Sequence, residues 1–269
     1  MDNVSELYLK DKYLNKDIEL LVNKQIIEYD LKSANTSLCK EYKLLSESDI
    51  ERIEKLPKDC RNVTIGKLCR KDKTLNEGLK SAFKDIRRRF FIQNEIEDDD
   101  ILSIKKDAIF CLRPCKYTDF GKCHFVEKNV YTSYMYLNKH LELYYNCGRI
   151  MDEHGIVHVK GISDISLETH KEHMLVFISD IFKLLETGDN KSLYKYFSKF
   201  VSDYKHRRLP TNYYREFDNM SVIRLMDLNV TFTKDTFIPY TPEETNEHLD
   251  IDYNFANVLL PMMKIILRK

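Results

Sequence analysis

The sequence contains no tryptophan and little glycine or proline, with 7 Gly and 6 Pro among 269 residues. Such scarcity argues against collagen-like segments, repeats and long disordered linkers. No apolar run approaches the roughly 18 residues of a membrane-spanning helix, so no membrane partner is expected. The charged opening segment, MDNVSELYLKDKYLNKD, also lacks the apolar core of a signal peptide. We therefore expect a cytoplasmic protein, located in the host cytoplasm if its source is viral.

Net charge is also absent, because 43 Lys and Arg balance 43 Asp and Glu. A protein that held nucleic acid through bulk charge would be basic, so any polyanion site must be a local basic patch. The seven cysteines are odd in number and irregularly spaced, which disfavours a disulfide framework and favours a reducing compartment. Hydrophobic residues make up 43% of the chain, enough for one large domain or two small ones.

Hydrophobic spacing in the first third predicts one strand followed by several helices. The strand ends near Asp30, and a helix follows over residues 33–44. SESDIERIEKL (46–56) begins with a serine cap and acidic residues, which predicts a second helix. We expect a basic loop at NVTIGKLCRKDK (62–73) and a long helix over residues 75–95.

The remainder of the chain predicts strands first and helices later. ILSIKKDAIFCL (101–112) has apolar runs on both sides of a charged trio, which predicts a hairpin with Asp107 at its tip. Further strand-like pieces occupy residues 125–162. Two amphipathic helices are then expected on either side of residues 188–190, and an apolar helix ends the chain.

Asp30 and Asp107 raise a chemical question, because a carboxylate at the end of an apolar strand is costly to bury without a partner. A central antiparallel sheet would bring the hairpin tip beside the end of the first strand. Two carboxylates would repel there unless they shared a divalent cation. Mg²⁺ or Mn²⁺ prefers such oxygen ligands, completed by water and phosphate. Each residue also has a structural explanation, Asp30 as a helix cap and Asp107 as a turn residue.

Four basic residues recur at helical spacing in the predicted 75–95 helix: Lys80, Lys84, Arg87 and Arg88. One cationic stripe of this kind suits the phosphates of a nucleoside triphosphate. The alternative is a solvated helix face, which is the commoner role of such a charge pattern.

Three segments resemble motifs of family B DNA polymerases, in the same order. IIEYDLKSANTSL (26–38) resembles motif A, LKSAFKDIRRRFF (79–91) resembles the motif B helix, and ILSIKKDAIF (101–110) resembles the motif C hairpin. The resemblance implies a palm domain of a minimal phage- or plasmid-type polymerase. It makes Asp30 and Asp107 the catalytic metal ligands for Mg²⁺ or Mn²⁺.

The same resemblance implies the nucleotide-binding residues. Lys80 or Lys84 occupies the place of the phosphate-binding lysine, and the backbone near Ser33 would lie against the triphosphate. Asn35 corresponds to the bulky tyrosine that excludes ribose 2′-hydroxyls, so we expect weak discrimination against ribonucleotides. Lys105 stands where motif C has a second acid. The Asn-Ser-x-Tyr-Gly run of motif B is absent.

We therefore predict an α+β fold: an antiparallel palm-like sheet with packed helices, followed by a mostly helical C-terminal part. Residues 1–165 form the palm-like domain with a short fingers insertion at 40–96, and residues 166–269 form the thumb-like part. The predicted function is metal-dependent nucleotidyl transfer in DNA replication. Its partners are nucleoside triphosphates, a DNA or RNA strand and other protein subunits.

Two alternatives remain open. One is a non-catalytic nucleic-acid-binding or regulatory protein on a degenerate palm, favoured by Lys105 in the place of an acid. The other is a template-independent enzyme, either a nucleotide cyclase or an oligonucleotide synthetase, which would use the same two-metal chemistry.

Three further groups have a functional and a structural interpretation. Lys205, Arg207 and Arg208 end a predicted helix, where cations either clamp a nucleic-acid backbone or complement the helix dipole. His170 and His173 are expected to be surface residues rather than a metal pair. The last group consists of three thiols and one imidazole: Cys111, Cys115, Cys123 and His124. It either binds zinc or consists of ordinary buried thiols beside a histidine, and the spacing of the residues leaves both interpretations open.

Overall fold

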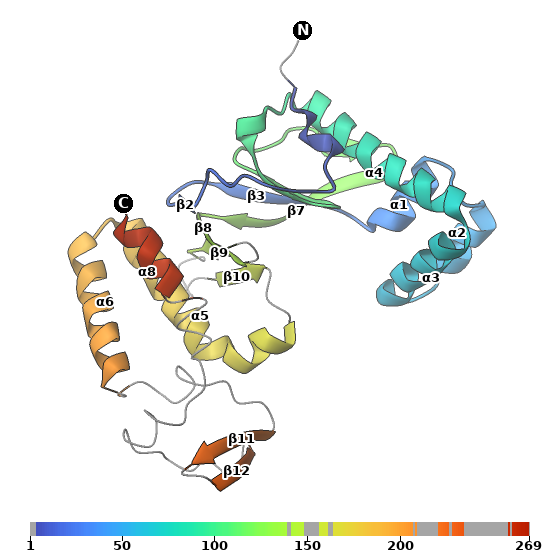
Figure 1. Ribbon diagram of the computed structural model, residues 1–269. Coiled ribbons are helices and arrows are strands. Elements are labelled where there is room, and N and C mark those ends of the chain that lie inside the picture. Colours follow the sequence, from blue (N-terminus) through green and yellow to red (C-terminus); the bar gives the residue numbers. More distant parts are fainter. Residues whose placement is uncertain are drawn as a thin grey trace. The chain divides into compact units, whose positions relative to one another are not determined.

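The protein is a mixed α+β protein, as predicted, in which antiparallel sheets are packed against helices (Figure 1). This computed structural model describes residues 4–138, 141–147, 156–160, 164–206, 208, 220–225, 228–233, 258 and 260–268. Within those residues, no helix combines the length and the apolarity needed to cross a bilayer.

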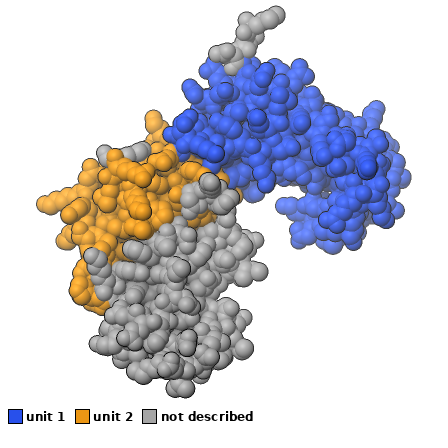
Figure 2. Space-filling model, in the orientation of Figure 1, with its two compact units in different colours: residues 1–18, 25–130 blue, residues 19–24, 131–269 orange. Residues whose placement is uncertain are grey.

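The chain divides into two compact units (Figure 2). Unit 1 consists of residues 1–18 and 25–130, and unit 2 consists of residues 19–24 and 131–269. This division by contacts differs from the boundary after residue 165 expected from the sequence. The palm, fingers and thumb assignments rest on a functional resemblance, so they stay predictions.

Unit 1 is built on a six-stranded sheet in the order β1-β4-β5-β3-β7-β6. The strands are β1 (Lys12–Leu14), β3 (Ile26–Leu31), β4 (Ile101–Lys105), β5 (Ala108–Cys111), β6 (Asp119–Phe120) and β7 (Cys123–Tyr131). The β4–β5 hairpin turns at Lys106 and Asp107, which confirms the predicted hairpin. β5 also pairs with β3, and Ala108 lies opposite Asp30 in that ladder.

The helices of unit 1 largely follow the predicted pattern. They are η1 (Glu6–Leu9), α1 (Ala34–Glu41), α2 (Glu47–Glu54), α3 (Lys58–Lys71), α4 (Lys73–Gln93) and η2 (Asp98–Asp100). The Ser46 side chain accepts a hydrogen bond from the Asp49 amide, 3.2 Å away, which confirms the predicted cap of α2.

The predicted basic loop at residues 62–73 is wrong, because most of that segment belongs to α3. Pro57 ends the preceding helix and directly precedes α3, where its missing N–H costs no helical hydrogen bond. Ile65 is buried in the core, and Leu68 packs against it. Those two apolar side chains anchor a helix whose other positions are mostly polar.

The core of unit 1 lies between the sheet and α4. Ile27, Tyr29 and Leu31 belong to this core, and the Tyr29 ring lies 5.5 Å from that of Phe90 on α4. Because side chains alternate along a strand, Glu28 and Asp30 project from the opposite face of β3. The strand therefore presents apolar residues to α4 and two acids to the other side.

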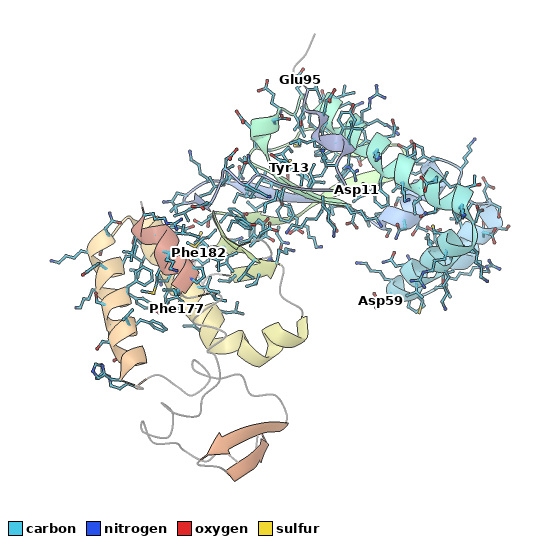
Figure 3. The ribbon with its side chains drawn as sticks, viewed as in Figure 1. Asp11, Tyr13, Asp59, Glu95, Phe177 and Phe182 are labelled. Atoms are coloured by element: carbon cyan, nitrogen blue, oxygen red, sulfur yellow. The ribbon has the colours of Figure 1, made fainter. Side chains whose placement is uncertain are left out.

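Unit 2 contains a four-stranded sheet in the order β10-β9-β8-β2, with helices packed on it. The strands are β2 (Leu20–Leu21), β8 (Ser133–Asn138), β9 (Leu141–Asn146) and β10 (Ile156–Lys160), and β11 (Met220–Leu225) and β12 (Leu228–Thr233) form a separate hairpin. The helices are α5 (Asp164–Thr187), α6 (Asn190–Lys205) and α8 (Leu260–Leu267). Phe177 and Phe182 of α5 are buried in the core of this unit (Figure 3).

Two of these helices confirm the predicted amphipathic pair. Gly188, with φ +68°, lies between α5 and α6 at the predicted junction. A left-handed backbone is accessible to glycine without the steric penalty that other residues incur.

Candidate functional site

The structure brings Asp30 and Asp107 together at one end of the β3–β5 ladder. The Leu31 amide donates a 2.9 Å hydrogen bond to the Asp107 carbonyl, and Asp30 lies opposite Ala108. Burial raises the pKa of Asp30, and the negative charge of Asp107 adds to that rise. We call Asp30 and Asp107 the acid pair.

Asp30 is held in a partly buried and mixed electrostatic environment. Burial is the main cause of its raised pKa, and Asp107 and Glu28 add to that rise. Lys128 acts in the opposite direction, with its Nζ 3.5 Å from Asp30 Oδ2. Asp30 is 28% exposed, so its carboxylate stays accessible from one side.

Sequence reasoning missed Glu28 and Lys128 as members of this site. Glu28 is 2% exposed, and its Oε2 accepts a 2.7 Å hydrogen bond from Asn129 Nδ2. Its Oε1 lies 4.0 Å from Lys128 Nζ. The signal was the two-residue spacing of Glu28 and Asp30, which puts both acids on one face of a strand.

Two residues with positive φ flank the acid pair. Ser33 has φ +50° just before α1, and Lys106 has φ +56° in the hairpin turn. Non-glycine residues in this region are strained, and such strain is common at functional sites. The Ser33 carbonyl accepts hydrogen bonds from Thr36 and Ser37 at the start of α1, whereas its side chain makes no capping bond.

The predicted cationic stripe does not lie on a single exposed face of α4. Lys80, Lys84 and Arg88 are exposed, but Arg87 is only 1% exposed. Its Nε donates to the Tyr8 carbonyl, Nη1 to the Lys106 carbonyl and Nη2 to Asp11. The physical reason is the 3.6-residue helical period, which turns Arg87 toward the core side and Arg88 toward solvent.

Two of the exposed cations of α4 have acidic neighbours on the same helix. Lys80 Nζ lies 2.8 Å from Glu77, and Arg88 Nη1 lies 3.9 Å from Asp85. Both pairs are solvent-exposed and contribute little stability. Lys80 also lines a groove of about 250 Å³ with Asp11 and Lys106.

A larger pocket of about 510 Å³ is formed in the same unit by α1, α3, the start of α4 and the hairpin turn. Asn35 of α1 belongs to its lining, and its Nδ2 donates to Asn62 Oδ1 over 3.1 Å. Three cations also line it: Arg70, Lys73 and Lys106. We call this the α1–α3 pocket.

The predicted nucleic-acid clamp lies in unit 2 and is only partly described. The Arg208 Nε donates to Asp203 over 2.8 Å, and its Nη2 donates to Ser202. Lys205 ends α6, but its side chain lies outside the described residues, as does all of Arg207. The side chains of His170 and His173 lie outside them as well.

The three thiols and one imidazole considered for zinc do not form a single metal group. Cys111 and Cys115 are buried with their sulfurs 3.9 Å apart, whereas His124 pairs with Asp119. Burial raises the pKa of Cys123 to about 12. Among all the described residues, no group of three or more His, Cys, Asp and Glu side chains is placed to hold a metal ion.

These observations define a mixed α+β protein in which an acid pair and a cation-lined pocket lie in the same compact unit. The chain belongs to the family described as Bacteriophage PBS1 gene 130 protein, whose model matches residues 1–268. A search of curated proteins finds no match. The family description names a phage gene product, in agreement with the phage type expected, and it does not mention a polymerase.

Proposed function

We propose that this phage protein is a palm-type nucleotidyltransferase that adds nucleotides to a nucleic-acid strand in the host cytoplasm. The observation that carries this proposal is the acid pair, two aspartates distant in sequence that meet at the end of β3 and the turn before β5. The motif resemblance also implies that the phosphate-binding helix lies beside these aspartates, whereas α4 packs against the opposite face of β3 from Asp30.

The donor set of the acid pair fits a divalent cation. Carboxylate oxygens are the ligands preferred by Mg²⁺ and Mn²⁺, with water and substrate phosphate completing the coordination. Asp30 and Asp107 would hold such an ion, which would supply charge stabilisation of the transferring phosphoryl group. In the free protein, the positive charge of Lys128 partly neutralises the Asp30 carboxylate, because Lys128 Nζ lies 3.5 Å from Asp30 Oδ2.

The reaction supported by this site is displacement at the α-phosphorus of a nucleoside triphosphate. The 3′-oxygen of the strand forms a bond to phosphorus, the bond to the pyrophosphate oxygen breaks, and the hydroxyl proton passes to solvent. The chain positions the reactants and stabilises developing charge, which is how proteins contribute to phosphoryl transfer.

The test is strand extension with labelled nucleotides in Mg²⁺ or Mn²⁺. We expect Asp30→Asn and Asp107→Asn each to reduce incorporation to background, because each removes an anionic ligand while keeping side-chain size. Asp99→Asn is the matched control, since Asp99 is an exposed acid in η2 outside the acid pair. Circular dichroism of each variant checks that the fold is retained.

Full incorporation by either acid-pair variant would overturn the proposal. The product also separates templated extension from a cyclase or an oligonucleotide synthetase, because those enzymes form product without a template. Parallel reactions with ribo- and deoxyribonucleotides test the expected weak sugar discrimination at Asn35. A strong preference for deoxyribonucleotides would contradict that part.

A second candidate is a non-catalytic nucleic-acid-binding protein on a degenerate palm. Lys128 favours it, because this cation already neutralises Asp30 without a metal ion. Lys105 favours it too, since it stands in the place of an acid and lies over the Phe110 ring. This candidate predicts strand binding by fluorescence anisotropy, unchanged in Asp30→Asn, with no nucleotide incorporated by the wild-type protein.

A further inference from the structure

We infer that the α1–α3 pocket binds a nucleoside triphosphate, with its phosphates on Arg70, Lys73 and Lys106 and a sugar hydroxyl on Asn35. The choice of a nucleotide over other polyphosphates rests on the proposed function, whereas the anion site rests on the pocket itself. These residues differ from the predicted α4 stripe, of which Arg87 is buried and Lys80 is paired.

The charge of the pocket selects an anion. Its lining contains Arg70, Lys73 and Lys106 and no Asp or Glu. No acidic side chain in the described part of the chain forms an ion pair with any of the three. Cations that share a concave polar site attract phosphate groups more strongly than the same cations spread over a surface.

Lys106 is fixed at the side of the pocket by its backbone. Its amide donates to the Asp11 carbonyl over 2.8 Å, and its carbonyl accepts from Arg87. Its charge also reaches the Cys69 thiol in the pocket lining, where it lowers the thiol pKa against the larger upward effect of burial. Its ammonium group lies over the Phe83 ring, 4.8 Å from the ring centroid, and Lys106 lines both the pocket and the neighbouring groove that Lys80 lines.

Asn35 provides an unused acceptor in the pocket. Its Nδ2 donates to Asn62, but its Oδ1 is buried and has no hydrogen-bond partner. A buried acceptor without a donor is destabilising, and such groups are rare in native proteins. Because this oxygen is closed to solvent, the Asn35 side chain must turn before a hydroxyl of a bound sugar can supply the missing donor. Phosphate oxygens, which are acceptors, cannot supply it.

The size and position of the pocket suit this ligand. A volume of about 510 Å³ lies in the range of small-molecule sites. The pocket is open beside Gly66, because a β-carbon added at this residue would meet no atom within 4 Å. Lys106 directly precedes Asp107, and α1, which carries Asn35, follows the strand that carries Asp30. The pocket and the acid pair thus share two chain segments.

The test is equilibrium binding by calorimetry, without a strand and therefore without turnover. The probes are ATP, inorganic tripolyphosphate and adenosine. Wild-type protein is expected to bind ATP more tightly than tripolyphosphate, and adenosine weakly. Arg70→Ala and Lys73→Ala should each lower the affinity for ATP and for tripolyphosphate about tenfold, which corresponds to roughly 1.4 kcal/mol. Lys67→Ala is the matched control, an exposed α3 lysine outside the lining, and should change neither.

Two further variants separate the parts of the site. Asn35→Leu keeps the size of the side chain and removes the acceptor. It should therefore weaken the binding of ATP and leave the binding of tripolyphosphate unchanged. Gly66→Phe should fill the pocket and abolish both, while thermal unfolding shows that α3 is intact.

Absence of ATP and tripolyphosphate binding by the wild-type protein would overturn the inference, as would binding that Arg70→Ala, Lys73→Ala and Gly66→Phe leave unchanged. Equal loss of both probes in Asn35→Leu would overturn the assignment of the sugar hydroxyl. Nucleotide binding of the expected pattern without any incorporation would refute the proposed function alone. Incorporation with unchanged KM in Arg70→Ala and Lys73→Ala would refute the pocket alone.

Discussion

Arg87 Nη1 donates a 2.8 Å hydrogen bond to the Lys106 carbonyl, which joins the long helix α4 to the turn of the β4–β5 hairpin. The other two N–H groups of the guanidinium donate to the Tyr8 carbonyl and to the carboxylate of Asp11. Asp11 is labelled in Figure 3. Arg87 is 1% exposed and Asp11 is 56% exposed. The residue before Asp107 is therefore held by a buried cation, so Arg87 fixes the turn of the β4–β5 hairpin through its backbone.

Arg87→Met should destabilise the protein by about 3 kcal/mol, because it leaves buried acceptors unsatisfied and breaks a charge-assisted pair. Urea unfolding measures this loss. Arg88→Met is the matched control on the exposed side of α4, and its effect should stay within about 0.5 kcal/mol. Equal losses in the two variants would show that Arg87 does not hold the hairpin.

Asp30→Asn should raise the free energy of unfolding at neutral pH. The pKa of Asp30 is raised in the folded protein, mainly by burial, so the folded state favours the protonated form. The ionised carboxylate then costs stability, which falls as pH rises from the ordinary aspartate pKa through the folded value. Asparagine carries no charge and removes that cost.

The stability difference between Asp30→Asn and wild type should therefore shrink as pH falls from 7 to about 3, below the ordinary aspartate pKa. Urea titrations at several pH values measure it. A variant that is less stable than wild type at pH 7 would mean that the Lys128 ion pair outweighs the burial of the carboxylate.

Gly66→Ala should stabilise the protein by roughly 0.5–1 kcal/mol, because alanine is favoured over glycine inside a helix. Gly66 lies inside α3, and a β-carbon there meets no atom within 4 Å. Gly78→Ala in α4 is the matched comparison, since its β-carbon would lie 3.0 Å from Leu44. Thermal unfolding should show the larger gain for Gly66→Ala, and the reverse order would contradict the described packing.

The sequence was sufficient to predict those elements in which local signals and packing agree. The Ser46 cap predicted α2, and the apolar runs around Lys105 and Asp107 predicted the hairpin. The many basic residues of segment 62–73 favour a loop, and they obscure the two apolar residues, Ile65 and Leu68, that pack into the core. Tertiary packing decided that helix, as it does for most weakly patterned helices.

The sequence singled out Asp30, Asp107 and Asn35 as candidate residues, but not the residues that lie around them. Asp30 and Asp107 stand out in sequence because each interrupts or ends an apolar run. Lys128 is nearly a hundred residues from Asp30, and only the placement of β7 beside β3 brings it to 3.5 Å. Asn35 and Arg70 likewise share a pocket because α1 and α3 meet in space, which no linear pattern encodes. Tertiary packing, and not a local sequence pattern, brings these residues together.

The most direct test of the central claim is Mn²⁺ binding by electron paramagnetic resonance, with and without ATP. The account predicts that wild-type protein binds Mn²⁺, more tightly with ATP, and that Asp30→Asn and Asp107→Asn each lose this binding while Asp99→Asn keeps it. Binding that survives in both acid-pair variants, or an absence of Mn²⁺ binding by the wild-type protein with ATP present, would contradict the account.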